Sequence, residues 1–258
     1  MYLDVVDLRD FYAQDLGFTV REILIQRLTE RWPTVAGDRL LGLGYTTPYL
    51  SVFRPTAERT LAFMPATQGV VNWPPDGPSA SALVIEDMLP LPDAAVDRVL
   101  LVHALEVAGD PREVLREVWR VLAPGGRLVA VVPNRRGLWA RVDTSPFGYG
   151  RPFSRGQLTQ LLRESLFSPV GWAEALHMMP LNRRRFRRSA NTWETIGRRL
   201  WPAFAGVIIV EATKQLYQGL PAKRRAVRAP AFRPALIPSP AGAGLSPRLG
   251  ETAGDPPG

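Results

Sequence analysis

The sequence has no cysteine and only two histidines, His103 and His177. Without cysteine the chain has no disulfide, no thiolate metal site and no cysteine nucleophile. Two histidines cannot supply a three-histidine metal site, so we predict no metal centre. Long hydrophobic runs are also missing: none reaches the ~20 residues of a membrane span. The acidic start, Met1–Asp7, lacks the basic region of a signal peptide. We therefore expect a soluble, cytoplasmic protein.

Positive charge is in excess, with a formal net charge of +8, but it is unevenly distributed. Residues 182–258 hold 14 basic and 4 acidic residues, whereas residues 1–181 have a net charge of −2. A strongly basic domain often binds nucleic acid. However, lysine is nearly absent, with only Lys214 and Lys223 among 32 basic residues. A GC-rich coding sequence produces the same arginine bias, so the charge alone does not assign a function.

Apolar periodicity divides the chain into helical and extended segments. Residues 4–31 have helical spacing, with a break expected at Gly17. Asp110 and Ser154 each precede a helical pattern and predict capped helix starts, and another helix is expected at 193–200. Strands are predicted at 39–44, 60–64, 82–85, 97–103, 126–132, 170–178 and 206–211.

This alternation predicts an α/β fold, because strands that are apolar on both faces need helices on both sides. The two late strands suggest an antiparallel pair that completes the sheet. From about residue 219 the chain is rich in proline and arginine and has no apolar stripe, which is typical of a disordered tail. We expect an N-terminal helical segment at 1–31, the main domain at 32–218 and the tail at 219–258.

Several motifs in the middle of the chain together resemble a known family. They are Leu89–Val99 (LPLPDAAVDRV), Leu105-Glu106, Asp110-Pro111 and Val121–Leu128 (VLAPGGRL). This string resembles the class I S-adenosylmethionine-dependent methyltransferases, in their type 11 group. The resemblance covers roughly residues 30–216 and is most specific within 89–134. It implies a Rossmann-like seven-stranded sheet whose last strand is antiparallel.

The resemblance implies that the cofactor, S-adenosylmethionine, lies across the carboxyl ends of the first strands. Glycines after the first strand would approach the methionine part, an acid after the second would hold the ribose, and an acid after the third would meet the adenine. We therefore single out nine candidate cofactor residues: Gly42, Gly44, Tyr45, Met64, Glu86, Asp87, His103, Leu105 and Glu106.

The sequence departs from the family pattern at the first two strands. Gly42 stands where the family has an acid, and Thr46 and Pro48 replace later glycines. The second strand supplies no acid for the ribose. Two hypotheses therefore stay open: an active methyltransferase with an altered pocket, and a non-catalytic relative that acts as a binding protein through its arginine cluster at Arg183–Arg188. No dedicated catalytic base is evident. His103 follows the fourth strand in the right region for one, but a lone histidine there is more often structural or a neighbour of the cofactor.

The loop after the fifth strand contains candidate residues for the methyl acceptor. Arg135, Arg136 and Arg151 could bind an anionic acceptor, with Tyr149, Trp139 and Phe147 covering it. An ordinary surface loop with solvated arginines is the alternative.

Five arginines lie between the two late strands, within Arg183–Arg188. A nucleic-acid patch, and with it an RNA-directed methyltransferase, is one hypothesis, since each neutralised phosphate adds affinity. A surface for an acidic partner or a membrane is another, and a solvated turn is the third. The single Phe186 is too little for a base-stacking platform.

Overall fold

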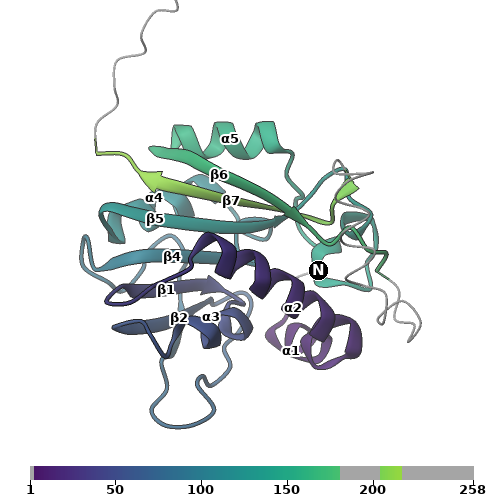
Figure 1. Cartoon of the computed structure of the whole chain (residues 1–258), viewed down its shortest axis with the longest axis horizontal. Helices are drawn as coiled ribbons and strands as arrows, with labels where there is room; N and C mark the ends of the chain where they lie inside the picture. Colours follow the sequence, from purple (N-terminus) through teal and green to yellow (C-terminus); the bar gives the residue numbers. More distant parts are fainter. Residues whose placement is uncertain (1–2, 181–203, 217–258) are drawn as a thin grey trace, which may run out of the picture. The chain divides into compact units, whose positions relative to one another are not determined.

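The computed structural model describes residues 3–180 and 204–216, in which seven strands form one sheet. The strand order is β3-β2-β1-β4-β5-β7-β6 (Figure 1). The strands are β1 (Arg39–Gly44), β2 (Arg59–Pro65), β3 (Ser81–Val84), β4 (Val96–Val102), β5 (Leu122–Pro133), β6 (Phe167–Ala175) and β7 (Val207–Lys214). β7 pairs antiparallel with both β5 and β6, whereas the pairs among β1 to β5 are parallel. The predicted α/β sheet with an antiparallel last strand is confirmed.

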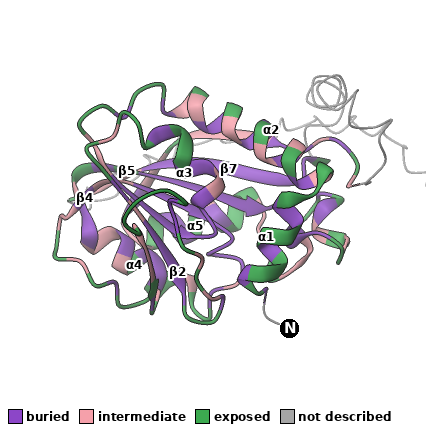
Figure 2. Ribbon diagram, turned by 90° about the horizontal axis from the view of Figure 1, so that it is seen from below, coloured by how far each residue is buried: buried purple, intermediate pink, exposed green. Residues whose placement is uncertain are grey.

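Helices cover both faces of the sheet, as predicted. They are α1 (Val5–Ala13), α2 (Asp15–Arg31), α3 (Thr47–Phe53), α4 (Pro111–Val121) and α5 (Arg155–Glu164), with short 3-10 turns η1 (Trp139–Arg141) and η2 (Pro146–Gly148). Leu100 and Val102 of β4 pack with α1, α2 and α3, whereas Val99 and Leu101 pack with α4 and α5. This alternation follows from the two-residue period of a strand. Figure 2 shows the resulting purple interior, with green mainly on outer helix faces and loops.

Local signals explain where several elements begin. The Asp110 side chain accepts a hydrogen bond from the Arg112 backbone N–H and so caps α4. Ser154 and Gln157 form the predicted reciprocal capping box of α5. The expected break at Gly17 is wrong, because the helix breaks at Gln14 and Gly17 lies inside α2. A side chain at Gly17 would collide with the Phe11 backbone, so glycine is needed there for the contact between α1 and α2.

Strand boundaries differ from the predicted ones by a few residues, most at β6. Its predicted start at Val170 is wrong, because β6 already begins at Phe167 and accommodates Pro169 through a bulge. Within the described ranges no helix is long and apolar enough to cross a membrane. The predicted helix at 193–200, the cluster Arg183–Arg188 and the tail at 219–258 lie outside the described residues.

Candidate cofactor site

The carboxyl ends of β1 and β4 lie next to each other, with Gly44 paired to Val102. Gly44 has a positive φ of 87°, and a side chain there would collide with the Val102 carbonyl oxygen. The strand can therefore leave the sheet here only with glycine. His103, the residue after β4, also has a positive φ, 52°, which is uncommon for a residue with a side chain. Such outliers gather at functional sites, so this junction is the first place to search for one.

A buried polar cluster lies at this junction, formed by Tyr12, Tyr49, Gln68, His103 and Glu106. The Tyr49 hydroxyl donates to the Tyr12 hydroxyl at 2.7 Å, and Tyr12 lies 2.8 Å from His103 Nε2. On the other side of the ring, His103 Nδ1 is 3.3 Å from Glu106 Oε1. Gln68 Nε2 donates to the His103 carbonyl at 3.1 Å. The polar cluster thus connects α1, α3 and the segments that follow β2 and β4.

One arrangement of hydrogens suits this cluster. Since Tyr12 accepts from Tyr49, its own hydroxyl hydrogen can point to His103 Nε2. His103 would then carry its hydrogen on Nδ1, toward the Glu106 carboxylate. Burial raises the pKa of Tyr12 and of Tyr49 well above the ordinary value for a phenol, so both keep their hydrogens at neutral pH. Tyr12 thus engages His103 Nε2, whereas His103 Nδ1 faces the Glu106 carboxylate without forming a hydrogen bond to any described residue.

Several buried polar atoms at the junction have no hydrogen-bond partner among the described residues. They are Thr46 Oγ1, Gln68 Oε1, His103 Nδ1 and both carboxylate oxygens of Glu106. Leaving a buried polar atom unpaired costs about 1–3 kcal/mol. Groups of this kind are usually paired with ordered water or with a ligand. The junction therefore has the chemistry of a binding site, although its own side chains now fill it.

Aromatic side chains close the junction. Tyr12 stacks on Tyr45 with ring centroids 5.5 Å apart, and Phe147 lies 4.8 Å from the His103 ring. Figure 1 shows that α1 lies beyond the carboxyl ends of the strands. Tyr12 belongs to this helix and contacts His103 from it. The whole run from Leu41 to Thr47 is buried, so none of these residues presents surface to a ligand. With α1 in this position, the cofactor does not fit against β1.

The predicted cofactor residues are distributed over this junction and beyond it. Four of them lie at the junction: Gly44, Tyr45, His103 and Glu106. Gly42 lies in β1, directly against the Thr46 side chain. Met64 is buried and its sulfur accepts from the Val71 N–H, while Leu105 packs on the other face of the sheet with α4. Beyond β3, Glu86 is half-buried and Asp87 is exposed. Among the described residues, no hydrogen bond or ion pair connects these two acids to the cluster.

Sequence reasoning missed Tyr12, Tyr49 and Gln68. Tyr12 lies among the regularly spaced apolar residues of α1, and nothing in the sequence indicates a partner 91 residues away. Gln68 follows β2, near the place where the family pattern has an acid. A polar residue directly after β2 is the only feature of the sequence that could have indicated the role of Gln68 in the cluster.

The acceptor candidates separate into two groups. Arg135 and Arg151 line a common pocket, whereas Arg136 does not line it and Tyr149 is half-buried against the core. The expectation that Trp139 and Phe147 cover an acceptor is wrong, because both are fully buried in the core. Among the described residues no group of three potential metal ligands occurs.

Residues 74–130 match the family model for a methyltransferase domain. The matched segment runs through β3, β4 and α4 into β5 and so omits β1 and β2. The chain has the fold that solved methyltransferases show. A protein of Mycolicibacterium smegmatis named "Probable S-adenosylmethionine-dependent methyltransferase" is 38% identical over 81 residues, which are 31% of each chain. The match to the curated relatives thus spans about a third of their length.

Solved structures give the same methyltransferase fold over more of the chain. An S-adenosylmethionine-dependent methyltransferase of Thermotoga maritima aligns with a TM-score of 0.57 at 16% identity, covering 82% of this chain and 96% of that one. The [4+2]-cyclase SpnF aligns with a TM-score of 0.50 at 20% identity, covering 75% of this chain and 81% of that one. Identities this low establish the fold alone, and fold does not determine chemistry.

Proposed function

We propose that this protein transfers a methyl group from S-adenosylmethionine to an acceptor. The observation that carries the proposal is the methyltransferase-domain match of residues 74–130, which includes His103 and Glu106 at the carboxyl end of β4. In an open α/β sheet, ligands bind at this edge. The unpaired oxygens of Thr46, Gln68 and Glu106 support a ligand there, because each would gain a hydrogen bond.

The proposal requires α1 to move. Tyr12 and Tyr45 fill the space beside Gly44, and the cofactor can reach β1 only when Tyr12 leaves. In that open state the backbone of Gly44–Thr46 and the side chains of Gln68 and Glu106 are the groups that would hold it. Glu86 and Asp87, which stay accessible beyond β3, are the candidates for its adenine end. The bound cofactor would supply an electrophilic methyl group on a positively charged sulfur. The protein would contribute mainly positioning and exclusion of water.

Calorimetry with S-adenosylmethionine and its demethylated product tests this proposal. We expect the wild-type chain to bind both, and Tyr12→Ala to bind them more tightly, because it weakens the closed state that competes with the cofactor. Tyr149→Ala, at a half-buried tyrosine outside the buried polar cluster, is the matched control and should bind like the wild type. Tyr12→Phe keeps the packing and should shift affinity in the same direction by less. No binding to any of these variants at millimolar cofactor would overturn the proposal.

The closed junction also favours a second candidate function, that of a methyltransferase-like protein that no longer binds the cofactor. The missing acid after β2 points the same way, since the neutral amide of Gln68 cannot form the charge-assisted hydrogen bonds that a carboxylate makes to a ribose diol. Calorimetry separates the two candidates directly. The RNA-directed alternative depends on Arg183–Arg188, which lie outside the described residues, and it stays a prediction.

A further inference from the structure

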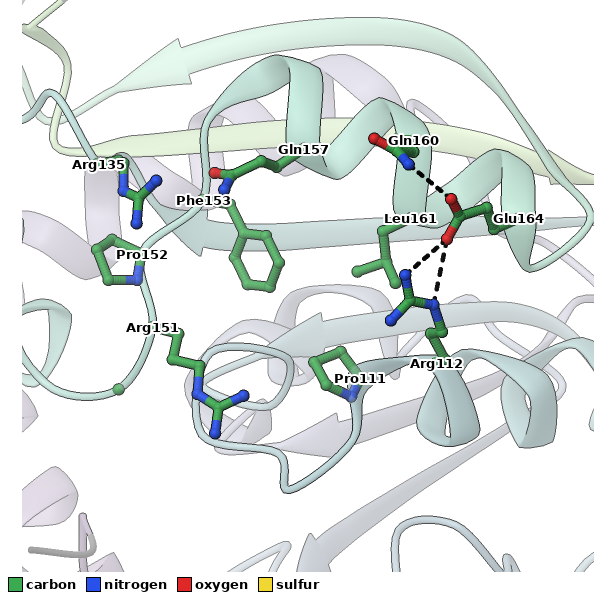
Figure 3. A pocket seen from close by; sticks show the side chains of 11 residues that line it. Pro111, Arg112, Arg135, Arg151, Pro152, Phe153, Gln157, Gln160, Leu161 and Glu164 are labelled. Carbon is green, nitrogen blue, oxygen red and sulfur yellow. Dashed lines mark hydrogen bonds and ion pairs between the residues drawn. The ribbon is translucent and has the colours of Figure 1, made fainter.

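A pocket of about 490 Å³ opens between the start of α4, the loop after β5 and α5. Its size is typical of small-molecule sites. Figure 3 shows Arg135 and Arg151 on one side, Arg112 with Glu164 on the other, and the apolar side chains of Phe153 and Leu161 between them.

The charges of this pocket are not balanced. Arg112 is neutralised by Glu164, which accepts from its Nε and Nη2 at 3.1 and 2.9 Å. Arg135 and Arg151 form no ion pair with any described residue. The pocket side chains therefore have an excess of two positive charges. Unpaired guanidinium groups beside an apolar wall are well suited to a carboxylate or phosphate, which they bind through paired N–H donors.

Backbone hydrogen bonds hold the two free arginines in place. The Arg135 N–H donates to the Phe153 carbonyl at 2.9 Å, and the Phe153 N–H donates to Pro133 of β5 at 2.9 Å. The Arg151 N–H donates to the Glu106 carbonyl at 2.7 Å. The loop from Asn134 to Phe153 is thus tied at both ends to the edge of the sheet. A site whose backbone is already fixed loses less entropy when a ligand binds.

We propose that this pocket binds a small molecule with an anionic group and an apolar body. The anionic group pairs with Arg135 and Arg151, and the body packs on Phe153 and Leu161. Since Arg151 is bonded to the backbone of Glu106, the pocket adjoins the candidate cofactor site. That its occupant is the methyl acceptor rests on the proposed function, whereas binding itself does not.

The test measures the binding of phenyl phosphate to the full-length chain by calorimetry, without cofactor and at fixed ionic strength. Inorganic phosphate, benzoate and neutral benzyl alcohol are the comparison probes. We expect phenyl phosphate and benzoate to bind, inorganic phosphate to bind more weakly and benzyl alcohol not to bind. Arg135→Gln and Arg151→Gln should each weaken phenyl phosphate binding by about tenfold or more, as expected for a charged hydrogen bond. Arg136→Gln removes the same charge from the neighbouring position and should leave binding unchanged.

Two results would overturn the proposal that this pocket binds an anion. The first is no binding of either phenyl phosphate or benzoate. The second is a loss of phenyl phosphate affinity in Arg136→Gln equal to that in Arg135→Gln and Arg151→Gln, which would indicate a nonspecific charge effect. Failure of cofactor binding with intact phenyl phosphate binding would overturn the proposed function and leave the pocket. The reverse result would remove the pocket and leave the proposed function.

Discussion

The carboxyl edge of the sheet has two neighbouring regions of opposite character. At the ends of β1 and β4 the buried polar cluster is closed by aromatic side chains of α1 and η2. Between α4, α5 and the loop after β5, the pocket lined by Arg135 and Arg151 is open and positively charged. The two regions share a backbone link, the hydrogen bond from Arg151 to Glu106.

The two regions show two states in which a binding site can exist before its ligand arrives, one closed and one open. The closed region gains stability from packing and must lose part of it before a ligand enters, so its ligand affinity is reduced by the population of the closed state. The open region keeps charges unpaired and accessible, so its ligand needs no rearrangement. If both proposals hold, the acceptor pocket is ready before the cofactor site is, and α1 controls only the second.

The largest effect is expected at Phe147, which tests whether the closed region is part of the core. Phe147→Ala should lower the free energy of unfolding by about 3–5 kcal/mol, because the side chain is fully buried between Phe11, His103 and Trp139. Urea denaturation measures it. Phe18→Ala, on the outer face of α2 with a half-exposed ring, is the matched control and should cost about 0.5 kcal/mol or less. A loss below about 1 kcal/mol at Phe147 would show that the closed region is loosely packed.

The next effect is expected at Tyr12, whose hydroxyl joins Tyr49 to His103. Tyr12→Phe should lower the free energy of unfolding by about 1–3 kcal/mol, because it leaves two buried polar groups without a partner. Tyr149→Phe removes a hydroxyl from a half-buried ring outside the buried polar cluster and should be close to neutral. Equal stability of the two variants would show that the hydrogen bonds of Tyr12 to Tyr49 and His103 do not stabilise the fold.

A smaller effect is expected at Ser154, which caps the helix that forms one wall of the open pocket. Ser154→Ala should lower the free energy of unfolding by about 1 kcal/mol, since it removes the acceptor for the Gln157 N–H. Thr159→Ala, whose exposed hydroxyl only bonds back to the Arg155 carbonyl, provides the control and should change little. If the two changes have the same cost, the capping box does not stabilise this wall.

The sequence predicted the sheet well, and the reason lies in particular strands. β4 and β5 are apolar on both faces, a pattern that is typical of central parallel strands, and the antiparallel last strand followed from the resemblance. The capping box at Ser154 could be recognised because its signal is local. The β6 boundary could not be predicted, because Pro169 is tolerated only through a bulge that depends on pairing with β7.

The candidate site could be predicted less well, because its contacts join distant segments. Tyr12 meets His103 only after α1 has folded over the sheet edge, and its spacing alone resembles that of any core residue. Arg135, Arg136 and Arg151 were all predicted to bind the acceptor, but only Arg135 and Arg151 line the pocket. The hydrogen bond from the Arg135 N–H to the Phe153 carbonyl, which joins the two ends of the loop, cannot be seen in the sequence. The sequence identifies the arginines of this loop, but it does not show which of them line the same pocket.

The smallest effect concerns the one acid in the open pocket. Glu164→Gln frees Arg112, so it should tighten binding of benzenesulfonate by roughly two- to fivefold, within the range of an exposed ion pair. A hydrogen bond from Gln160, with the Arg112 pair, lowers the pKa of Glu164, so this carboxylate stays charged at pH 5–7. The difference between variant and wild type should therefore be constant over that range. It should shrink as the pH falls through the lowered pKa, where the wild-type carboxyl takes up a proton and also releases Arg112. Benzenesulfonate keeps one charge throughout, so a difference that persists at the lowest pH would show that Glu164 does not set the charge of the pocket.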